Sequence, residues 1–189
     1  MCMITIPIEV SGRHVHLSVE DWYRCFGTAE PTSSRPLSQL PQYVAQERVQ
    51  IIGPEGRFDR VAMVGPLRAY TQVELTQTDA RILGLQLPLR QSGDLKEAAS
   101  ISIVGPKGSV QSPAAIRQRR HIHAGPTDAA AHRLHDGQIA SVTVGGDRGG
   151  RFDQVVVRVA AGYTWRMHVD TDEANAFGIV PGTIGRVEI

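Results

Sequence analysis

Two short segments of the sequence repeat one pattern of arginine and histidine. Residues 13–16 read RHVH, and residues 120–123 read RHIH. In a β-strand, residues i and i+2 point to the same face with Cα atoms roughly 6.5–7 Å apart, so the two imidazoles of each segment can converge on one ion. Neutral imidazole is a common ligand of Zn²⁺, with a nitrogen-to-zinc distance of about 2.0–2.1 Å. Each segment therefore predicts two ligands of a metal site.

A second repeat supplies a third ligand for each pair. Residues 73–80, VELTQTDA, align with residues 167–174, MHVDTDEA, and the same alignment places Gly84 over Gly178. Glu74 and His168 then occupy equivalent positions where a strand passes into a helix. Because a catalytic zinc takes three protein ligands and leaves one position open, the sequence predicts two metal sites. Their ligands are His14, His16 and Glu74 in the first and His121, His123 and His168 in the second.

Other interpretations of these residues stay open from sequence alone. One His-x-His on a strand is more often a pair of partly exposed histidines, and it is the duplication that favours metal binding. Arg13 and Arg120 are expected on the opposite strand face, where a salt-bridge role and a catalytic role are equally compatible with the sequence. His132 and His135 lie on or just after a predicted helix and are expected at the surface.

The distribution of apolar residues predicts a mainly β protein. Short runs rich in Val, Ile and Thr alternate with Gly and Pro, which is typical of many strands joined by tight turns. Residues 53–56 and 105–108, GPEG and GPKG, each lie between two such runs and predict hairpin turns. Because strand-then-helix units occur in two pairs, we expect two related β-barrels or sandwiches with short capping helices. Helices are predicted over residues 18–26, 78–83 and 126–134, and a loop over residues 28–41.

Length and charge narrow the classes of function. The chain has 189 residues, 41% of them hydrophobic, enough for one compact domain or two small ones. Its formal net charge of +1 gives no overall field to attract nucleic acid or an anionic membrane, and RQRR at residues 117–120 is expected to be a solvated strand edge. Because no long apolar run or signal sequence is found, a cytoplasmic protein is expected. Cys2 and Cys25 have no metal-binding or redox spacing and are expected to be reduced thiols.

Seven blocks of sequence carry a resemblance to a known family. They are Ser11–Ser18 (SGRHVHLS), Val64–Arg68 (VGPLR), Thr71–Glu74 (TQVE), Arg90–Lys96 (RQSGDLK), Gly105–Gly108 (GPKG), Arg120–His123 (RHIH) and Met167–Asn175 (MHVDTDEAN). In these blocks, which follow the family's order over nearly the whole chain, the sequence resembles the PduL-type phosphotransacylases, or phosphate propanoyltransferases.

The resemblance implies a fold and a site. It implies two β-barrels with a dinuclear metal site, usually zinc, at their junction, and the six ligands that it implies are those identified above from the repeats. It also implies an exchange of segments, with residues 3–12 joining 119–189 in one barrel and residues 13–118 forming the other. Arg68 matches the arginine that binds phosphate beside the metals. It precedes Glu74 by six residues, so the two side chains would face the same side if they shared a strand.

The implied reaction is acyl-CoA + phosphate ⇌ acyl phosphate + CoA, by direct attack of phosphate on a short-chain thioester. Two zinc ions are the expected cofactors, with coenzyme A as substrate or product. Small molecules, rather than nucleic acid or a membrane, are the expected partners. The phosphates of CoA need cations, and those flanking the matched blocks are Arg90, Lys96, Lys107, Arg117 and Arg119.

Two alternatives to this enzyme are a metal-dependent hydrolase with the same ligands and a non-catalytic zinc-stabilised barrel. Many compartment-bound family members carry an amphipathic N-terminal extension that directs them into a bacterial microcompartment, whereas the strand-like residues 4–10 begin at once here. Encapsulation, assembly into a homo-oligomer and the preferred acyl group are left open by the sequence.

Overall fold

The computed structural model describes residues 4–189, which form two compact units. Unit 1 combines the N-terminal residues up to Ser11 with Arg119–Ile189, and unit 2 comprises Gly12–Gln118. Each unit has its own buried core. That of unit 2 is centred on Leu17, Trp22 and Met63. The core of unit 1 includes Ile122 and Phe152.

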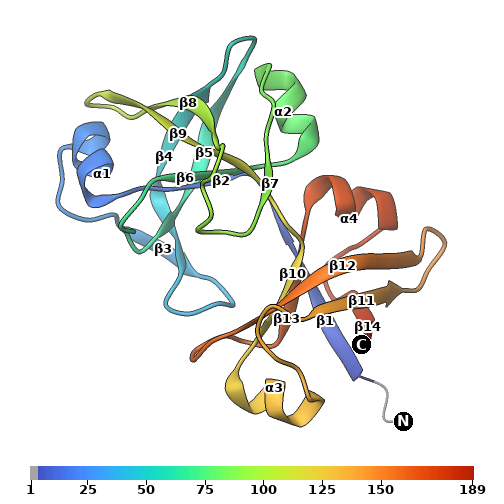
Figure 1. Cartoon of the computed structure of the whole chain (residues 1–189). Coiled ribbons are helices and arrows are strands. Elements are labelled where there is room, and N and C mark those ends of the chain that lie inside the picture. Colours follow the sequence, from blue (N-terminus) through green and yellow to red (C-terminus); the bar gives the residue numbers. More distant parts are fainter. Residues whose placement is uncertain (1–3) are drawn as a thin grey trace. The chain divides into compact units, whose positions relative to one another are not determined.

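Unit 1 is a closed barrel of six strands (Figure 1). The barrel runs in the order β1-β13-β10-β12-β11-β14, so the blue N-terminal strand is paired with red strands from the end of the chain. Two short helices follow β10 and β13. The elements are β1 (Ile4–Ser11), β10 (His121–Ala124), α3 (Pro126–His132), β11 (Ile139–Val144), β12 (Gly150–Val159), β13 (Arg166–Asp170), α4 (Thr171–Phe177) and β14 (Ile184–Glu188).

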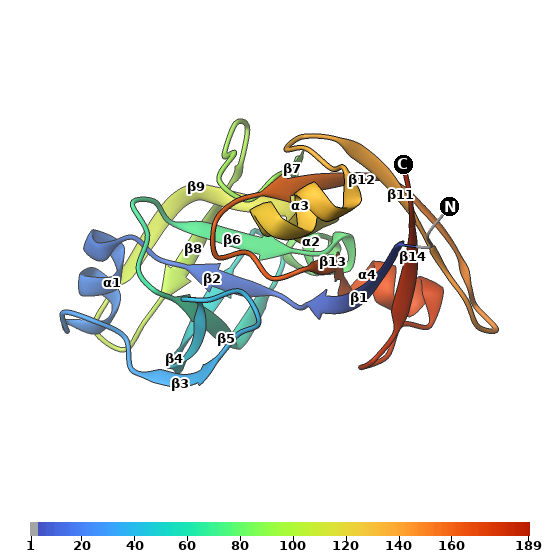
Figure 2. The same cartoon turned by 90° about the horizontal axis from the view of Figure 1, so that it is seen from below.

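Unit 2 closes in the same way, in the order β2-β5-β4-β8-β9-β6. Figure 2 shows the blue β2 near the teal β5 and the green β6, its two neighbours in the ring. Strands β3 and β7 pair with β4 and β9 as additions to the ring. The elements are β2 (His14–His16), α1 (Val19–Phe26), β3 (Ser33–Pro36), β4 (Tyr43–Ile52), β5 (Arg57–Gly65), β6 (Gln72–Leu75), α2 (Gln77–Leu83), β7 (Leu89–Arg90), β8 (Ala99–Val104) and β9 (Ser109–Gln118).

The two barrels have one pairing scheme, which explains the repeats in the sequence. Strand β2 is parallel to β5 and antiparallel to β6, just as β10 is parallel to β12 and antiparallel to β13. Strand β9 of unit 2 corresponds to β1 of unit 1, because each runs parallel to β6 or β13. In sequence, however, β1 precedes β2 and β9 precedes β10. Each barrel therefore takes this strand from just before the His-x-His of the other barrel.

The structure confirms a mainly β fold of two barrels with short helices. Helices α1, α2 and α3 lie within a few residues of the predicted ranges, and no helix among residues 4–189 is long and apolar enough to span a membrane. The prediction of a loop over residues 28–41 was wrong in part, because Ser33–Pro36 forms β3. Pro36 is compatible with this strand because β3 pairs on one side only, with β4, and proline is tolerated at a sheet edge.

The two Gly-Pro-x-Gly segments form the predicted hairpin turns and also cap helices. Gly53 donates to the Gly56 carbonyl at 2.9 Å, and Gly105 donates to the Gly108 carbonyl at the same distance. The third residue of each turn donates its N–H to a carbonyl in the last turn of a helix, Glu55 to Leu83 of α2 at 3.1 Å and Lys107 to Cys25 of α1 at 2.9 Å. These carbonyls have no partner within their own helix, so each turn satisfies one of them.

The close approach of turn to helix leaves no room for a side chain at the first glycine. A Cβ at Gly105 would lie 2.4 Å from the carbonyl oxygen of Cys25. We therefore expect Gly105→Ala to lower the free energy of unfolding by about 1–3 kcal/mol, because backbone must move to relieve the overlap. The matched control is Gly145→Ala, where a Cβ would meet nothing within 4 Å. Urea denaturation at fixed metal content measures the free energy of unfolding of both variants. Equal losses of stability in the two variants would contradict this account of the turn.

Candidate metal centre

The first predicted ligand set is assembled on two adjacent strands of unit 2. His14 and His16 lie on β2, and Glu74 lies directly opposite His14 on the antiparallel strand β6. The Nε2 atoms of the two histidines are 3.1 Å apart. The Glu74 carboxylate lies 3.4 Å from His14 Nε2 and 3.9 Å from His16 Nε2. Ligands of a tetrahedral zinc, each about 2.0–2.1 Å from the ion, are about 3.3 Å from one another, so these spacings suit a shared metal.

Backbone carbonyls determine which histidine nitrogen is available in this set. His14 Nδ1 lies 2.9 Å from the Gly12 carbonyl oxygen, and His16 Nδ1 lies 3.0 Å from that of Val64. A carbonyl oxygen only accepts, so each Nδ1 carries a proton, and the neutral form of each ring would present its lone pair at Nε2. Burial, helped by His14 and Arg68, holds the pKa of His16 well below its usual value. The two Nε2 lone pairs and the Glu74 carboxylate thus face one another, and the low pKa of His16 disfavours a second proton at its Nε2. A cation would stabilise this arrangement.

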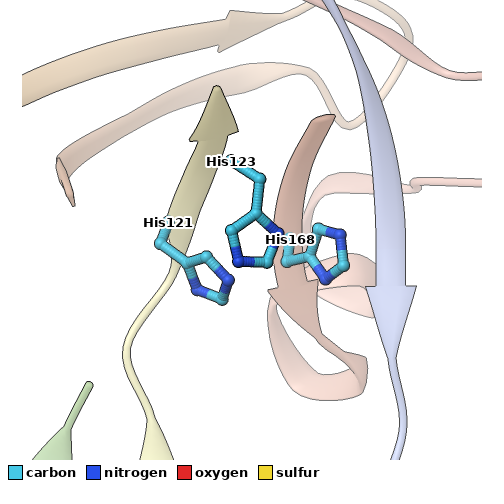
Figure 3. A group of neighbouring side chains, drawn as sticks. All are labelled: His121, His123 and His168. Carbon is cyan, nitrogen blue, oxygen red and sulfur yellow. The ribbon is translucent and has the colours of Figure 1, made fainter. Parts of the chain in front are cut away.

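The second set is built in the same register in unit 1. His121 and His123 lie on β10, and His168 lies opposite His121 on β13. His121 Nδ1 is 2.9 Å from the Arg119 carbonyl oxygen, the counterpart of the bond from His14 to Gly12. Figure 3 shows the three rings grouped between their strands, and one nitrogen from each lies within 4.8 Å of the others. The predicted equivalence of Glu74 and His168 is thus present in the structure.

Both sets contain buried polar atoms that form no hydrogen bond within residues 4–189, although His168 Nε2 lies 3.4 Å from Glu9 Oε2. Among the described residues 4–189, Glu74 Oε2, His121 Nε2, His123 Nδ1 and His168 Nε2 are buried without a hydrogen-bond partner. Burial, with the histidines as neighbours, lowers the pKa of His121 to about 3 and that of His123 to about 2. Both rings are therefore neutral at physiological pH, the form that binds metal. A bound metal ion would satisfy atoms whose burial otherwise costs free energy.

Arg13, the residue before the first His-x-His, ties β2 to the helix that follows Glu74. Its Nε and Nη2 donate to Asp79 Oδ1 at 3.0 and 2.7 Å, and its guanidinium carbon lies 4.1 Å from the centre of the Phe58 ring. Asp79 also accepts from the Thr76 N–H, closing the capping box of α2. Since α2 begins three residues after Glu74, this ion pair holds the two halves of the ligand set in register.

Arg120 repeats this arrangement in unit 1. Its Nε lies 2.8 Å from Glu173 Oε1, and its guanidinium carbon lies 5.2 Å from the centre of the Phe152 ring. Glu173 closes the capping box of α4 with Asp170, two residues after His168. Of the two roles left open for the arginines, the structure therefore supports ion pairing.

The structure also corrects the expectation of a solvated strand edge at residues 117–120, because all four residues are partly buried.

Comparison with known proteins agrees with the resemblance seen in the sequence. The family model for phosphate propanoyltransferase matches residues 7–180. The chain belongs to this family. Among its relatives, the phosphate propanoyltransferases of Salmonella typhimurium, Listeria monocytogenes and Clostridioides difficile are 43%, 42% and 44% identical to it. The matches cover 92%, 96% and 96% of this chain and 83%, 86% and 88% of the relatives. The protein is thus a phosphate acyltransferase, and its membership rests on segments of both units.

In this family member, Arg68 lies near the first ligand set but not on its strand. The condition for the same-face argument, a strand shared by Arg68 and Glu74, is not met. Strand β5 ends at Gly65, β6 begins at Gln72, and Arg68 forms an isolated bridge with Ser18. Its N–H donates to the Leu17 carbonyl at 2.9 Å, which anchors it beside β2. Its Nη1 donates to Ser92 Oγ at 3.2 Å.

Gln72 and Ser92 are site residues that sequence reasoning did not identify. Gln72 Nε2 donates to Glu74 Oε1 at 2.5 Å and to Ser92 Oγ at 2.8 Å, while Gln72 Oε1 accepts from the Gly93 N–H at 2.8 Å. Gln72 therefore donates to Glu74 Oε1 and leaves Oε2, which lies 3.4 Å from His14 Nε2, without a hydrogen bond. Its position two residues before Glu74 was a usable signal, because i and i+2 share a strand face.

The five cations predicted to bind CoA have different surroundings. Arg90 pairs with Glu97 at 2.6 Å, and Arg117 donates to Gln77 Oε1 at 2.8 Å. Lys96 and Lys107 are exposed, and Arg119 is partly buried. The geometry gives no single cluster among them, so their contact with CoA stays a prediction.

Removing one histidine from either set should remove one metal ion. We expect His14→Ala and His121→Ala each to reduce bound zinc from about two ions per chain to about one, because two ligands alone hold zinc weakly. Elemental analysis after purification without chelator measures this, with circular dichroism to verify the fold. His135→Ala, at an exposed position, is the control and should keep both ions. Unchanged zinc in the two site variants would mean that these histidines are not ligands.

Proposed function

We propose that the protein transfers a short acyl group between coenzyme A and inorganic phosphate, using two zinc ions held by the six ligands. The observation that carries the proposal is the pair of buried ligand sets, with spacings and unpartnered atoms suited to metal, in a member of the phosphate propanoyltransferase family. The donors are five imidazoles and one carboxylate, which suit zinc better than the oxygen-preferring Mg²⁺ or Ca²⁺. When bound, such ions supply positive charge that polarises a carbonyl and stabilises oxyanion and thiolate groups.

The chain's own residues then bind and orient the reactants. Arg68 holds phosphate through its planar fork, which can engage two oxygens at once. Ser92 accepts from the Arg68 guanidinium and from Gln72, so it links the phosphate-binding arginine to the residue that orients Glu74. The phosphate oxygen forms the new bond to the acyl carbon as the bond to sulfur breaks, and CoA leaves as the thiolate.

Direct attack by phosphate needs no acyl-enzyme. Cys25, the one thiol within residues 4–189, is buried, and burial raises its pKa, so it is a poor nucleophile. We therefore propose a ternary complex in which both substrates are bound before the bond to sulfur breaks.

A metal-dependent hydrolase could use the same ligands to activate water, and product analysis separates the two enzymes. The proposal requires acyl phosphate and free CoA in equal amounts, formed only when phosphate is present. A hydrolase would release free acid and CoA from propanoyl-CoA without phosphate. A non-catalytic barrel would do neither.

The sharpest kinetic test concerns Arg68. Arg68→Lys keeps the charge but loses the two-oxygen fork, so we expect kcat/KM for phosphate to fall on the order of 10²-fold, about 3 kcal/mol, with zinc content unchanged. The control is Arg186→Lys, on β14, whose side chain is 54% exposed. Wild-type phosphate kinetics in both Arg68→Lys and Arg68→Ala would show that another cation binds phosphate.

A further inference from the structure

The two ligand sets differ in the charge of the residues beside them. Strands β5 and β12 align with β2 and β10 through the pairs His14 with Ala62 and His121 with Val156. Two residues further on, Val64 in unit 2 therefore corresponds to Arg158 in unit 1. On the other flank, His16 pairs with Gln72, whereas His123 pairs with Arg166. The duplicated scaffold thus places two arginines beside His123 where unit 2 has uncharged residues.

These two arginines have different partners. Arg166 Nε lies 3.5 Å from Glu9 Oε1, so an acidic residue balances its charge. Arg158 is partly buried, and none of the residues described, 4–189, forms an ion pair or a hydrogen bond with its guanidinium. Its guanidinium carbon is 5.8 Å from the centre of the Tyr163 ring, near the outer limit of a cation–π contact. Such a contact alone offsets little of the cost of partly burying a charge.

Arg158 faces the second ligand set. It is the direct cross-strand neighbour of His123, and the Tyr163 ring beside it lies 4.2 Å from the His123 ring. Unlike the first set, this set includes no carboxylate among its three ligands. The acidic residue beside this set is Glu9 on β1, whose Oε2 lies 3.4 Å from His168 Nε2, while Arg158 lies on the opposite flank, on β12. A metal ion bound here would therefore favour an anion on the Arg158 side.

We infer that Arg158 binds a phosphate group of a substrate beside the His121, His123 and His168 set. The inference rests on the proposed function, in which both inorganic phosphate and CoA carry phosphate groups. Arg68 offers a parallel, because its guanidinium likewise has no acidic partner within residues 4–189 and lies near the other ligand set. The two arginines come from positions that the duplication does not relate, Arg68 from a loop and Arg158 from β12. Each ligand set thereby has its own anion-binding arginine.

Calorimetric titration of the zinc-loaded protein tests this role with three ligands: inorganic phosphate, CoA, and pantetheine, which has the thiol end of CoA without its phosphates. We expect Arg158→Lys and Arg158→Gln to weaken binding of phosphate or of CoA about 10- to 100-fold, with pantetheine affinity unchanged. A loss confined to inorganic phosphate assigns Arg158 to that substrate. A loss confined to CoA assigns it to the phosphates of the coenzyme.

The matched control is Arg166→Gln, which removes a charge from the other flank of His123. It should weaken the same ligand at most about 3-fold, because Arg166 already has Glu9 as a partner. The inference would be overturned if both Arg158 variants keep wild-type affinities or if they weaken pantetheine binding equally. It would also be overturned if Arg166→Gln loses as much affinity for the same ligand. Loss of zinc in both Arg158 variants would also overturn it, since Arg158 would then act in metal retention. If the wild type binds neither phosphate nor CoA, the proposed function itself fails.

Discussion

Buried histidine lone pairs that face one another are the constraint on which the structure depends. In unit 2 the Nε2 atoms of His14 and His16 are 3.1 Å apart, and backbone carbonyls accept from both Nδ1 atoms. In unit 1, burial lowers the pKa of His121 to about 3, so protonation does not relieve the equivalent crowding at neutral pH. Neutral rings held in this way cost free energy unless a cation lies between them. A metal ion bound to these residues would therefore stabilise each barrel.

The barrel architecture meets this constraint by holding each ligand set on two paired strands. The third ligand lies directly across from the first histidine, at Glu74 in one unit and His168 in the other. The arginine before each His-x-His then anchors the strand to the capping acid of the next helix, Asp79 or Glu173. The ion pair, the aromatic ring beneath it and the capping box recur in both units. This recurrence is best explained by a positioning role for Arg13 and Arg120.

Much of the site could be predicted because the two repeats have their strands and helices in the same order along the chain. Aligning the two repeats was sufficient to pair Glu74 with His168, since both follow the same strand-to-helix pattern. The mainly β fold followed from short apolar runs and from turns such as Gly105–Gly108. The capping of α1 by that turn could not be predicted, because it joins Lys107 to Cys25, residues far apart in sequence. Long-range contacts of this kind leave no local pattern in the sequence.

The same limit applies to the residues around the two candidate ligand sets. Gln72 contacts Ser92 through a loop whose path depends on the closed barrel, so spacing alone could not bring them together. Arg158 lies in an ordinary strand pattern, and its lack of an acidic partner becomes visible only when its neighbours are placed. Arg68 was found through resemblance, and the argument from a shared strand does not apply to it because it lies in the loop between β5 and β6. Duplicated ligands were thus more predictable than the residues that distinguish the two sets.

X-ray absorption at the zinc edge tests the central claim most directly, because it reports the atoms bound to the metal in the intact protein. For the zinc-loaded protein without substrate, we predict nitrogen or oxygen neighbours at about 2.0–2.1 Å. Five histidines shared by two ions would give outer-shell scattering from an average of about 2.5 imidazoles per zinc. Scattering from one imidazole or fewer per zinc, or a sulfur neighbour at about 2.3 Å, would contradict the account.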